Sequence, residues 1–278
     1  MLNPRRPPTI NTTLYDKLFL PLSYLPPPRS FLPANPLISR IYYIEAKDIT
    51  HLQSKSSSDG HPTRSKLVSF TAFLWKLMAE CEEDGLNKCK MGVVVDGRER
   101  LADCICSFDK LSLSNTTSFS TQNYFGNVLS IPYGEANVSE LKEMSLRLVA
   151  EMVHDFVSPA VTEEHFRGLI DWVELHRPEP TFAKVYAKLD EEFDSEAIVV
   201  SSGQRFPVDS IDFGWGKPYF GSYHFPWGGQ TGYVMPMPSA TKNGDWIVYM
   251  HLLQKHLDMV ETKGRNVFKP LSPSYLNF

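Results

Sequence analysis

Apolar and polar positions along the chain change period several times, and each change predicts a different element. Residues 38–49 are rich in β-branched and aromatic side chains and predict a strand, and residues 54–64 form a polar loop. Ser65 then precedes a segment whose apolar side chains recur at helical spacing, which predicts a helix over about 65–80. The recurring positions are Leu67, Phe70, Leu74, Leu77 and Met78.

The rest of the chain mixes both periods, so strands and helices are interleaved. Asn137 and Glu140 have the spacing of a capping box and predict the start of a long helix over 139–157. An Asn243–Gly244 pair predicts a tight hairpin turn. This order predicts an α/β (α+β) sandwich with a mixed β-sheet and flanking helices. The further predicted strands are 89–97, 123–134, 196–202, 232–238 and 245–252, and the further helices are about 160–174, 180–192 and 252–261.

The first 38 residues differ from the rest of the chain because prolines cluster there, in PRRPP and LPPPRSFLPANP. Proline lacks a backbone N–H and fixes φ, so the segment is predicted to be neither a central strand nor a helix interior. It is typical of an extended connector that crosses a surface. A connector at the start of a chain indicates a preceding domain that this sequence does not contain.

Composition narrows the class of function. The chain has 278 residues, 42% of them hydrophobic, and a formal net charge of −4, which gives no reason to expect nucleic acid or an anionic membrane as a partner. No apolar run is long enough for a membrane span, and no export signal opens the chain, so we expect a cytoplasmic protein. The four cysteines match no zinc spacing and predict no metal site.

Few side chains stand out as chemical groups. Ser201, Ser202 and Arg205 follow a predicted strand, where ligand-contacting groups gather in open sheets. No serine lies in a G-x-S-x-G elbow, and the glycine-rich stretch 212–229 opens no helix onto a phosphate. For each of the eight histidines a structural or solvated position is the better interpretation. The residues alone leave the function undetermined.

Four motifs, in this order and spacing, change that interpretation: DGR at 96–98, YFGN at 124–127, SSGQRFP at 201–207 and DFGWG at 212–216. With them the chain resembles the C-terminal half of a plant BAHD acyltransferase, a member of the acyl-CoA-dependent O- and N-acyltransferases. The ending, from DFGWG through NGDWIVYMHL, is most similar to the coniferyl (hydroxycinnamyl) alcohol acyltransferase-like branch.

The resemblance implies a fold and a domain organisation. Members of that family have two chloramphenicol acetyltransferase-like domains joined by a long crossover. By this resemblance, residues 1–38 correspond to the proline-rich crossover and residues 39–278 to the C-terminal acyltransferase domain.

The resemblance also implies an activity, the transfer of an acyl group other than amino-acyl from acyl-CoA to an alcohol or amine of plant specialised metabolism. In the family, the histidine of an H-x-x-x-D motif in the first domain deprotonates the acceptor. None of the eight histidines here has an aspartate four residues on, so we expect the chain to be inactive alone. The alternatives are one half of a split active enzyme, completed by an N-terminal half-domain, and a non-catalytic CoA-binding or regulatory module.

The family roles carry over to particular positions. Acyl-CoA would be a co-substrate, and no bound cofactor or metal is implied. Lys66 replaces the small hydroxyl residue that relatives often carry, and Asp212 is expected to pair with Arg98. The implied CoA contacts are Ser65 and Lys66; Asn127 would lie near the reaction centre; Ser201, Ser202, Gln204 and Arg205 would line the acceptor side; Asp212, Gly214, Trp215, Gly216 and Arg98 would be structural, with Phe213, Trp215 and Trp227 packing as core.

Overall fold

The computed structural model describes most of the chain. The described residues are 3–9, 12–25, 36–57, 62–81, 88–101, 124–187, 196–206, 210–218, 221–224, 231–239 and 243–276. The chain divides into two units that are each held together by their own contacts. The first comprises residues 1–28, 93–133 and 155–189, and the second comprises residues 29–92, 134–154 and 190–278.

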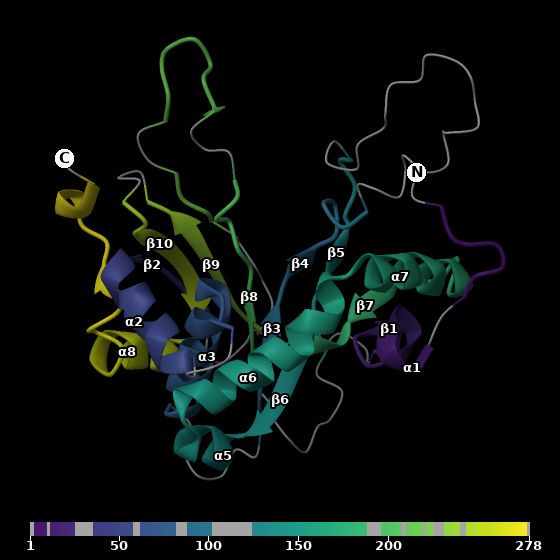
Figure 1. The fold of residues 1–278 in the computed structure, drawn as a ribbon, viewed down its shortest axis with the longest axis horizontal. Coiled ribbons are helices and arrows are strands. Elements are labelled where there is room, and N and C mark those ends of the chain that lie inside the picture. The colour runs from purple at the N-terminus through teal and green to yellow at the C-terminus, as the bar shows by residue number, and fades with distance from the viewer. Residues whose placement is uncertain are drawn as a thin grey trace. The chain divides into compact units, whose positions relative to one another are not determined.

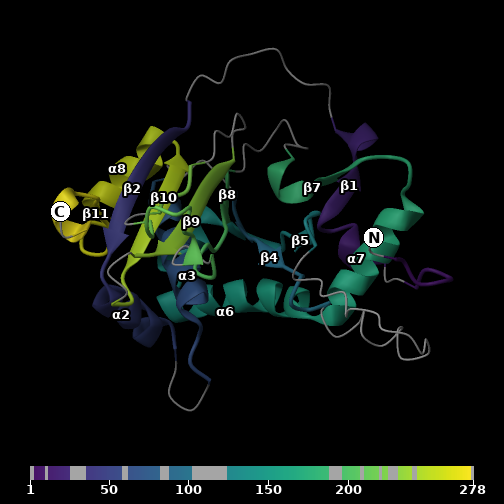
Figure 2. The same ribbon diagram turned by 90° about the horizontal axis from the view of Figure 1, so that it is seen from above.

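The second unit contains a mixed sheet of seven strands in the order β11-β2-β10-β9-β8-β3-β6 (Figure 1). Strand β9 runs parallel to β8 but antiparallel to β10, and β10 is antiparallel to β2. Figure 2 shows β2, β10, β9 and β8 side by side in this order. The bounds are β2 Ile38–Ile44, β3 Lys88–Val93, β6 Tyr133–Asn137, β8 Glu196–Val200, β9 Gly232–Pro238, β10 Trp246–Leu252 and β11 Lys269–Pro270.

Helices pack on one face of the β2–β10–β9 part of this sheet. The ring of Trp246 lies edge to face with the ring of Phe70 in α3, with centroids 5.6 Å apart. Tyr42 donates a hydrogen bond to Glu261 of α8. Since side chains alternate along a strand, the odd-numbered residues of β2, β9 and β10 lie on the opposite face. The helices of this unit are α2 Ala46–Ser56, α3 Lys66–Ala79, α5 Val138–Glu143, α6 Leu146–Val157 (whose last turn falls in the first unit), α8 Gln254–Thr262 and the 3₁₀ turn Pro273–Leu276.

The first unit is built around helix α7 (Glu163–Leu175) and two small sheets. Strand β1 pairs with β7, and β4 pairs with β5, both antiparallel. Phe166 of α7 packs with Val95, Leu101 and Val128 in an apolar cluster. The other bounds are α1 Thr12–Tyr15, β1 Phe19–Pro21, β4 Val95–Asp96, β5 Leu129–Ser130, β7 Thr181–Ala183 and the 3₁₀ turns Leu22–Tyr24, Ser158–Val161 and Lys184–Tyr186.

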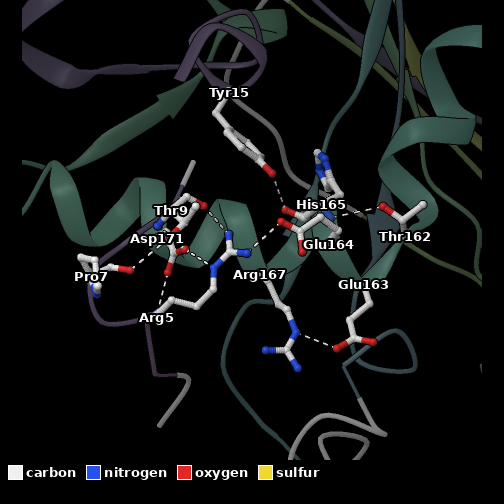
Figure 3. A network of polar contacts seen from close by, with 10 residues as sticks. All are labelled: Arg5, Pro7, Thr9, Tyr15, Thr162, Glu163, Glu164, His165, Arg167 and Asp171. Atoms are coloured by element: carbon white, nitrogen blue, oxygen red, sulfur yellow. Dashed lines mark hydrogen bonds and ion pairs between the residues drawn. The ribbon is translucent and has the colours of Figure 1, made fainter. Parts of the chain in front are cut away.

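A polar network joins the start of the chain to α7 (Figure 3). The guanidinium of Arg5 lies between Asp171 and Glu164 of that helix, and the backbone N–H groups of Arg5 and Thr9 also donate to Asp171. The Asp171 side chain is fully buried. Tyr15, also buried, donates from its hydroxyl to the carbonyl of His165 at 3.0 Å. The proline-rich start of the chain thus contains short regular elements that are built into the first unit.

Several predicted elements are confirmed. Residues 232–238 form β9 and residues 246–252 form β10, within one residue of the predicted strands. Ser65 caps α3, since its Oγ accepts a hydrogen bond from the N–H of Val68 at 3.2 Å. The glycine at position 244 suits the predicted hairpin, since its φ is +91°. The connection from β9 to β10, however, takes residues 239–245 rather than a two-residue turn.

Several predictions of local structure were wrong, among them the single strand over 123–134, which contains β5 and the start of β6 in two different sheets. The predicted strand over 38–49 ends at Ile44, and helix α2 follows, because Ile49, Leu52 and Ser56 lie on one buried side of a helix. The predicted helix over 139–157 is two helices, α5 and α6. Residues 181–187, expected to begin a helix, form β7 and a 3₁₀ turn, since β7 pairs with β1.

The break between α5 and α6 has a specific cause. The ammonium of Lys76, in α3, donates hydrogen bonds to three carbonyls at the end of α5: those of Leu141, Lys142 and Met144, at 2.5, 3.1 and 2.6 Å. These carbonyls would otherwise lack partners, as at any helix C-terminus. Ser145 then accepts from the N–H of Leu148 at the start of α6.

Within the described ranges, no helix combines the length and the apolar character needed to cross a lipid bilayer.

Candidate functional site

The loop that follows β8 holds four of the predicted binding residues: Ser201, Ser202, Gln204 and Arg205. It continues the β8–β9 ladder, since the N–H groups of Ser201 and Gly203 donate to the carbonyls of Val234 and Pro236, each at 2.9 Å. Ser202 accepts from the N–H of Gln204 at 3.4 Å. The loop is therefore fixed to the sheet by its backbone.

Two features orient this loop. A Cβ on Gly203 would lie 2.8 Å from Cγ of Met237, so only glycine lets the loop approach the odd-numbered face of β9 this closely. The side-chain nitrogen Nε2 of Gln204 is buried and has no hydrogen-bond partner among the described residues. A buried donor without a partner costs free energy, and a bound ligand could satisfy it. Arg205 is exposed.

The predicted CoA contacts lie at the start of α3. Ser65 uses its hydroxyl as the helix cap, and Lys66 is the first helical residue; both side chains are exposed. The unpaired N–H groups of a helix N-terminus favour anions such as phosphate. No contact in the structure tests whether these two residues bind CoA, so that role stays a prediction.

Arg98 connects two of the sequence motifs within the first unit. Its Nη1 lies 3.0 Å from the carboxylate of Asp96, its Nε donates to the carbonyl of Tyr124 at 3.0 Å, and its Nη2 donates to that of Gly126 at 2.8 Å. The DGR motif thereby holds the YFGN turn from both sides of Phe125, whose side chain is fully exposed. Asn127, which comes after Gly126, is exposed as well.

Asp212 organises the DFGWG turn locally. Its Oδ1 accepts from the N–H of Gly214 at 2.8 Å and of Gly216 at 3.3 Å. Both glycines have positive φ, +99° and +113°, and nothing lies within 4 Å of where their Cβ atoms would be. Arg98 belongs to the other unit, and the predicted pair between Asp212 and Arg98 stays a prediction.

The expected core packing of Phe213 and Trp215 was wrong for this chain. Their side chains are 74% and 87% exposed. The physical reason is that Asp212 closes the turn on itself through the N–H groups of Gly214 and Gly216, and the two tilted rings lie beside each other, with centroids 6.1 Å apart, rather than in the apolar interior. Trp227 lies outside the described residues.

A cavity of about 530 Å³ lies on the odd-numbered face of the main sheet, opposite the face on which α3 and α8 pack. Tyr249 of β10 lies directly between Ile41 of β2 and Met235 of β9, and the ring of Tyr223 packs on that of Tyr249 with centroids 5.9 Å apart. Met235 and Met237 pack with Tyr249 and also line the place where the loop at 203 approaches β9. The lining residues are Ser39, Arg40, Ile41, Ser222, Tyr223, His224, Tyr249 and Leu271.

The sequence did not single out this cavity. One signal was present, because the alternation in 246–252 places His251 on the same face as Tyr249. His251 is half-buried, and its Nδ1 lies 3.0 Å from Oγ of Ser39, its direct cross-strand neighbour. Among the described residues, no group of three metal-ligating side chains comes together.

Comparison with known proteins places this arrangement in a family. The profile of the Transferase family matches residues 26–267. The chain is 25% identical over 275 residues to a shikimate O-hydroxycinnamoyltransferase of Nicotiana tabacum, covering 92% of this chain and 58% of that protein. It is 26% identical over 263 residues to anthranilate N-benzoyltransferase protein 1 of Dianthus caryophyllus, covering 92% and 53%.

Solved structures agree on the fold. The structure of F. graminearum TRI101 complexed with ethyl coenzyme A superimposes with a TM-score of 0.65 at 16% identity, covering 94% of this chain and 54% of that one. The chain thus spans about half the length of the proteins that it resembles. The profile match over most of the sequence shows that the chain belongs to the Transferase family, the family of BAHD-type acyltransferases.

Proposed function

We propose that this chain supplies one half of an acyl-CoA-dependent acyltransferase and does not turn over substrate alone. The reaction is the transfer of an acyl group from acyl-CoA to a small alcohol or amine acceptor of plant specialised metabolism. The observation that carries the proposal is a family match over residues 26–267 in a chain without an H-x-x-x-D sequence.

The reaction needs a positioned base, and no histidine of this chain lies in an H-x-x-x-D sequence. An acceptor hydroxyl must lose its proton as it attacks the thioester carbonyl, and a positioned histidine accelerates such a step about 10²- to 10⁴-fold. His165 is buried and bonded to Ser130, and His256 is buried and paired with Glu196. Both positions are structural, which supports a base supplied by another polypeptide segment.

The contribution of this chain is substrate binding. The loop 201–205 carries two hydroxyls, the unsatisfied amide of Gln204 and the exposed Arg205, which suit a polar acceptor. Ser65 and Lys66 present a helix N-terminus and a positive charge, which suit the phosphates of CoA. Arg98 fixes the backbone of the YFGN turn and thereby the position of Asn127.

Exposed aromatic side chains support the proposal that another domain packs against this chain. Phe125 of the first unit and Phe213 and Trp215 of the second unit are almost fully exposed. Contiguous exposed apolar patches mark contact surfaces, and the rings of Phe213 and Trp215 lie side by side, with centroids 6.1 Å apart. We propose that an N-terminal half-domain bearing H-x-x-x-D covers these side chains, and that the chain alone self-associates or is poorly soluble.

The test is complementation. The chain is purified alone and after co-expression with the H-x-x-x-D-bearing half of a relative, and CoA release is followed with p-coumaroyl-, caffeoyl- or acetyl-CoA and coniferyl alcohol. Turnover only in the complemented sample supports the proposal. Turnover by the chain alone contradicts it, and CoA-dependent thermal stabilisation without turnover in either sample favours a non-catalytic CoA-binding module.

A further inference from the structure

The start of the chain is held on helix α7 and strand β7 by tertiary contacts (Figure 3). We call residues 3–9 and 12–25 the N-terminal segment, and α7 with β7 its docking surface. Figure 3 shows Arg5 and Tyr15 of the segment pointing toward α7. Tyr15 and His165, which share a hydrogen bond, are 150 positions apart in the sequence. The segment and its docking surface both belong to the first unit.

The first anchor of the segment is a charge pair. Nε of Arg5 lies 2.5 Å from Oδ2 of Asp171, and its Nη1 lies 2.8 Å from Oε1 of Glu164. The backbone N–H groups of Arg5 and Thr9 donate to the same Asp171 carboxylate, at 2.7 and 3.2 Å. Among the described residues, every donor to this fully buried carboxylate belongs to the segment. A docking surface without the segment would therefore hold a buried charge that lacks its partner.

The second anchor is a match of shape between Tyr15 and α7. The Tyr15 side chain is buried, and its hydroxyl donates to the carbonyl of His165 at 3.0 Å. A Cβ on Gly168 would lie only 2.0 Å from that hydroxyl, so a glycine is needed for the tyrosine to lie on the helix. Glycine disfavours a helix interior, and this contact with the segment accounts for its place in α7.

The third anchor is the addition of a strand. Strand β1 of the segment pairs with β7, and the N–H of Leu22 donates to the carbonyl of Pro180 at 2.8 Å beyond the end of the ladder. Nε1 of Trp172 donates to Asp16 at 2.8 Å, and the ring of Phe19 lies beside that of Trp172, with centroids 5.9 Å apart. Strand addition combined with side-chain anchors is a recurring mode of peptide recognition.

We infer that the docking surface of α7 and β7 is a peptide-binding site and that the N-terminal segment is its tethered ligand. The ligand that fits carries an arginine, a tyrosine ten positions later and then a short strand. Because the three anchors are noncovalent, they hold the segment in place even when the chain is cut behind it.

The tether decides which segment occupies the docking surface. A ligand on a short linker has an effective concentration on the order of 1 mM, so at about 1 µM a competing segment of equal affinity occupies the surface about 10³ times less often. One consequence rests on the proposed function and specifies its partner. The N-terminal half-domain that completes this chain gains no affinity from a crossover segment of its own, because the matching site is already occupied.

The experiment cuts the tether. A site-specific protease site is inserted between residues 28 and 29, where the first unit passes into the second, and the folded chain is cleaved. The cut segment should co-elute with the rest of the chain in gel filtration at about 10 µM. A labelled synthetic peptide of residues 1–28, added at equal concentration, should replace about half of it, whereas in the uncut chain about 1% or less should be replaced.

Peptide variants test the anchors without any risk to the fold of the chain. An Arg5→Ala peptide leaves Asp171 without its counter-charge and should compete about a hundredfold more weakly than the unchanged peptide. An Arg6→Ala peptide is the matched control, since that side chain is exposed, and should compete within about twofold. In the chain, Gly168→Ala favours the helix but places a Cβ against Tyr15, so it should weaken peptide binding about tenfold.

A second measurement tests the consequence for the partner. The H-x-x-x-D-bearing half of a relative is prepared in two lengths, ending before or after its crossover, and each is titrated into the uncut chain by calorimetry. The two Kd values should agree within about twofold. A longer half that binds about tenfold more tightly contradicts the inference, since its crossover would then displace the segment. If neither length binds, complementation fails, whereas the peptide exchange still decides the inference.

The inference is overturned if the cut segment separates from the folded chain at about 10 µM, or if the labelled peptide enters the cut and the uncut chain alike. Equal competition by the Arg5→Ala and Arg6→Ala peptides overturns the role of the charge pair as an anchor.

Discussion

Nε of Arg5 lies 2.5 Å from Oδ2 of Asp171, although 166 positions separate the two residues along the chain. The carboxylate is fully buried, and the guanidinium and two backbone N–H groups satisfy it. Together these hydrogen bonds hold the pKa of Asp171 below its ordinary value, against the opposing effect of burial. The start of the chain is thus bound to α7 by an ion pair that closes the first unit.

Arg5→Ala is expected to destabilise the protein by about 3 kcal/mol, because it leaves the buried carboxylate of Asp171 without its counter-charge. The adjacent Arg6 is the matched control, since its side chain is exposed, and Arg6→Ala should change the unfolding free energy by less than about 0.5 kcal/mol. Urea unfolding followed by circular dichroism measures both. Equal effects of the two substitutions would show that the ion pair contributes nothing specific.

The burial of His165 predicts that the protein loses stability in mild acid. It is buried against Tyr15 and Phe166, its Nε2 lies 2.8 Å from Oγ of Ser130, and burial lowers its pKa to about 4 from an unfolded value of about 6.5. The folded protein therefore resists protonation. The contribution of His165 to the free energy of unfolding is complete above pH 6.5. It falls as the pH drops from 6.5 to 4, by up to about 3 kcal/mol.

The control for this prediction is His165→Gln, which keeps a side chain that can bond to Ser130 but does not titrate. The difference between wild type and variant isolates the histidine, because Glu196, whose pKa is lowered to about 2, contributes its own loss only as the pH falls below about 4.5. Thermal unfolding is recorded at a series of pH values. Identical slopes for both proteins between pH 6.5 and 4.5 would contradict the assignment.

Lys76 is expected to hold the break between α5 and α6. Lys76→Met keeps most of the side-chain volume but removes the hydrogen bonds to the carbonyls of Leu141, Lys142 and Met144, and should cost about 2 kcal/mol. Hydrogen exchange should rise in the segment 140–148 more than elsewhere. Lys55→Met, at an exposed position near the end of α2, is the control and should leave both quantities unchanged.

The best-predicted elements are those in which the spacing of apolar residues along the sequence matches the pattern of buried side chains. Strands β9 and β10 were found within one residue, and the start of α3 was found from Ser65. The wrong predictions fall where a contact with a residue distant in sequence decides the local structure. The segment after residue 180 becomes a strand because β1 pairs with it, and the helix over 139–157 is divided where the ammonium of Lys76 binds α5, and neither partner is near in sequence.

The candidate site likewise combines residues that the sequence identified with residues that it did not. Ser201 was singled out because it follows a predicted strand, and Arg98 was assigned a role because it lies in a family motif. The cavity was not, since Ser39 and His251 become neighbours only through the register of β2 and β10. Alternation within one strand shows which face a side chain occupies, but not which residue of another strand lies opposite.

The predicted pair between Asp212 and Arg98 can be tested by a double-mutant cycle. The carboxylate of Asp212 accepts from Gly214 and Gly216, and Arg98 binds Asp96 and the YFGN turn. If these local contacts are all that the two residues make, Asp212→Asn and Arg98→Ala should add within about 0.5 kcal/mol in unfolding free energy. A pair that also joins the two residues should show a coupling of about 1 kcal/mol or more.

Asp212→Asn alone is expected to lower the melting temperature without removing any CoA contact, because Asn keeps an oxygen but not the charge. Gly214→Ala is the companion variant: nothing lies within 4 Å of its added Cβ, so its cost of about 1–2 kcal/mol would come from the positive φ alone. A melting temperature that neither substitution changes would mean that the DFGWG turn contributes nothing to stability in this chain.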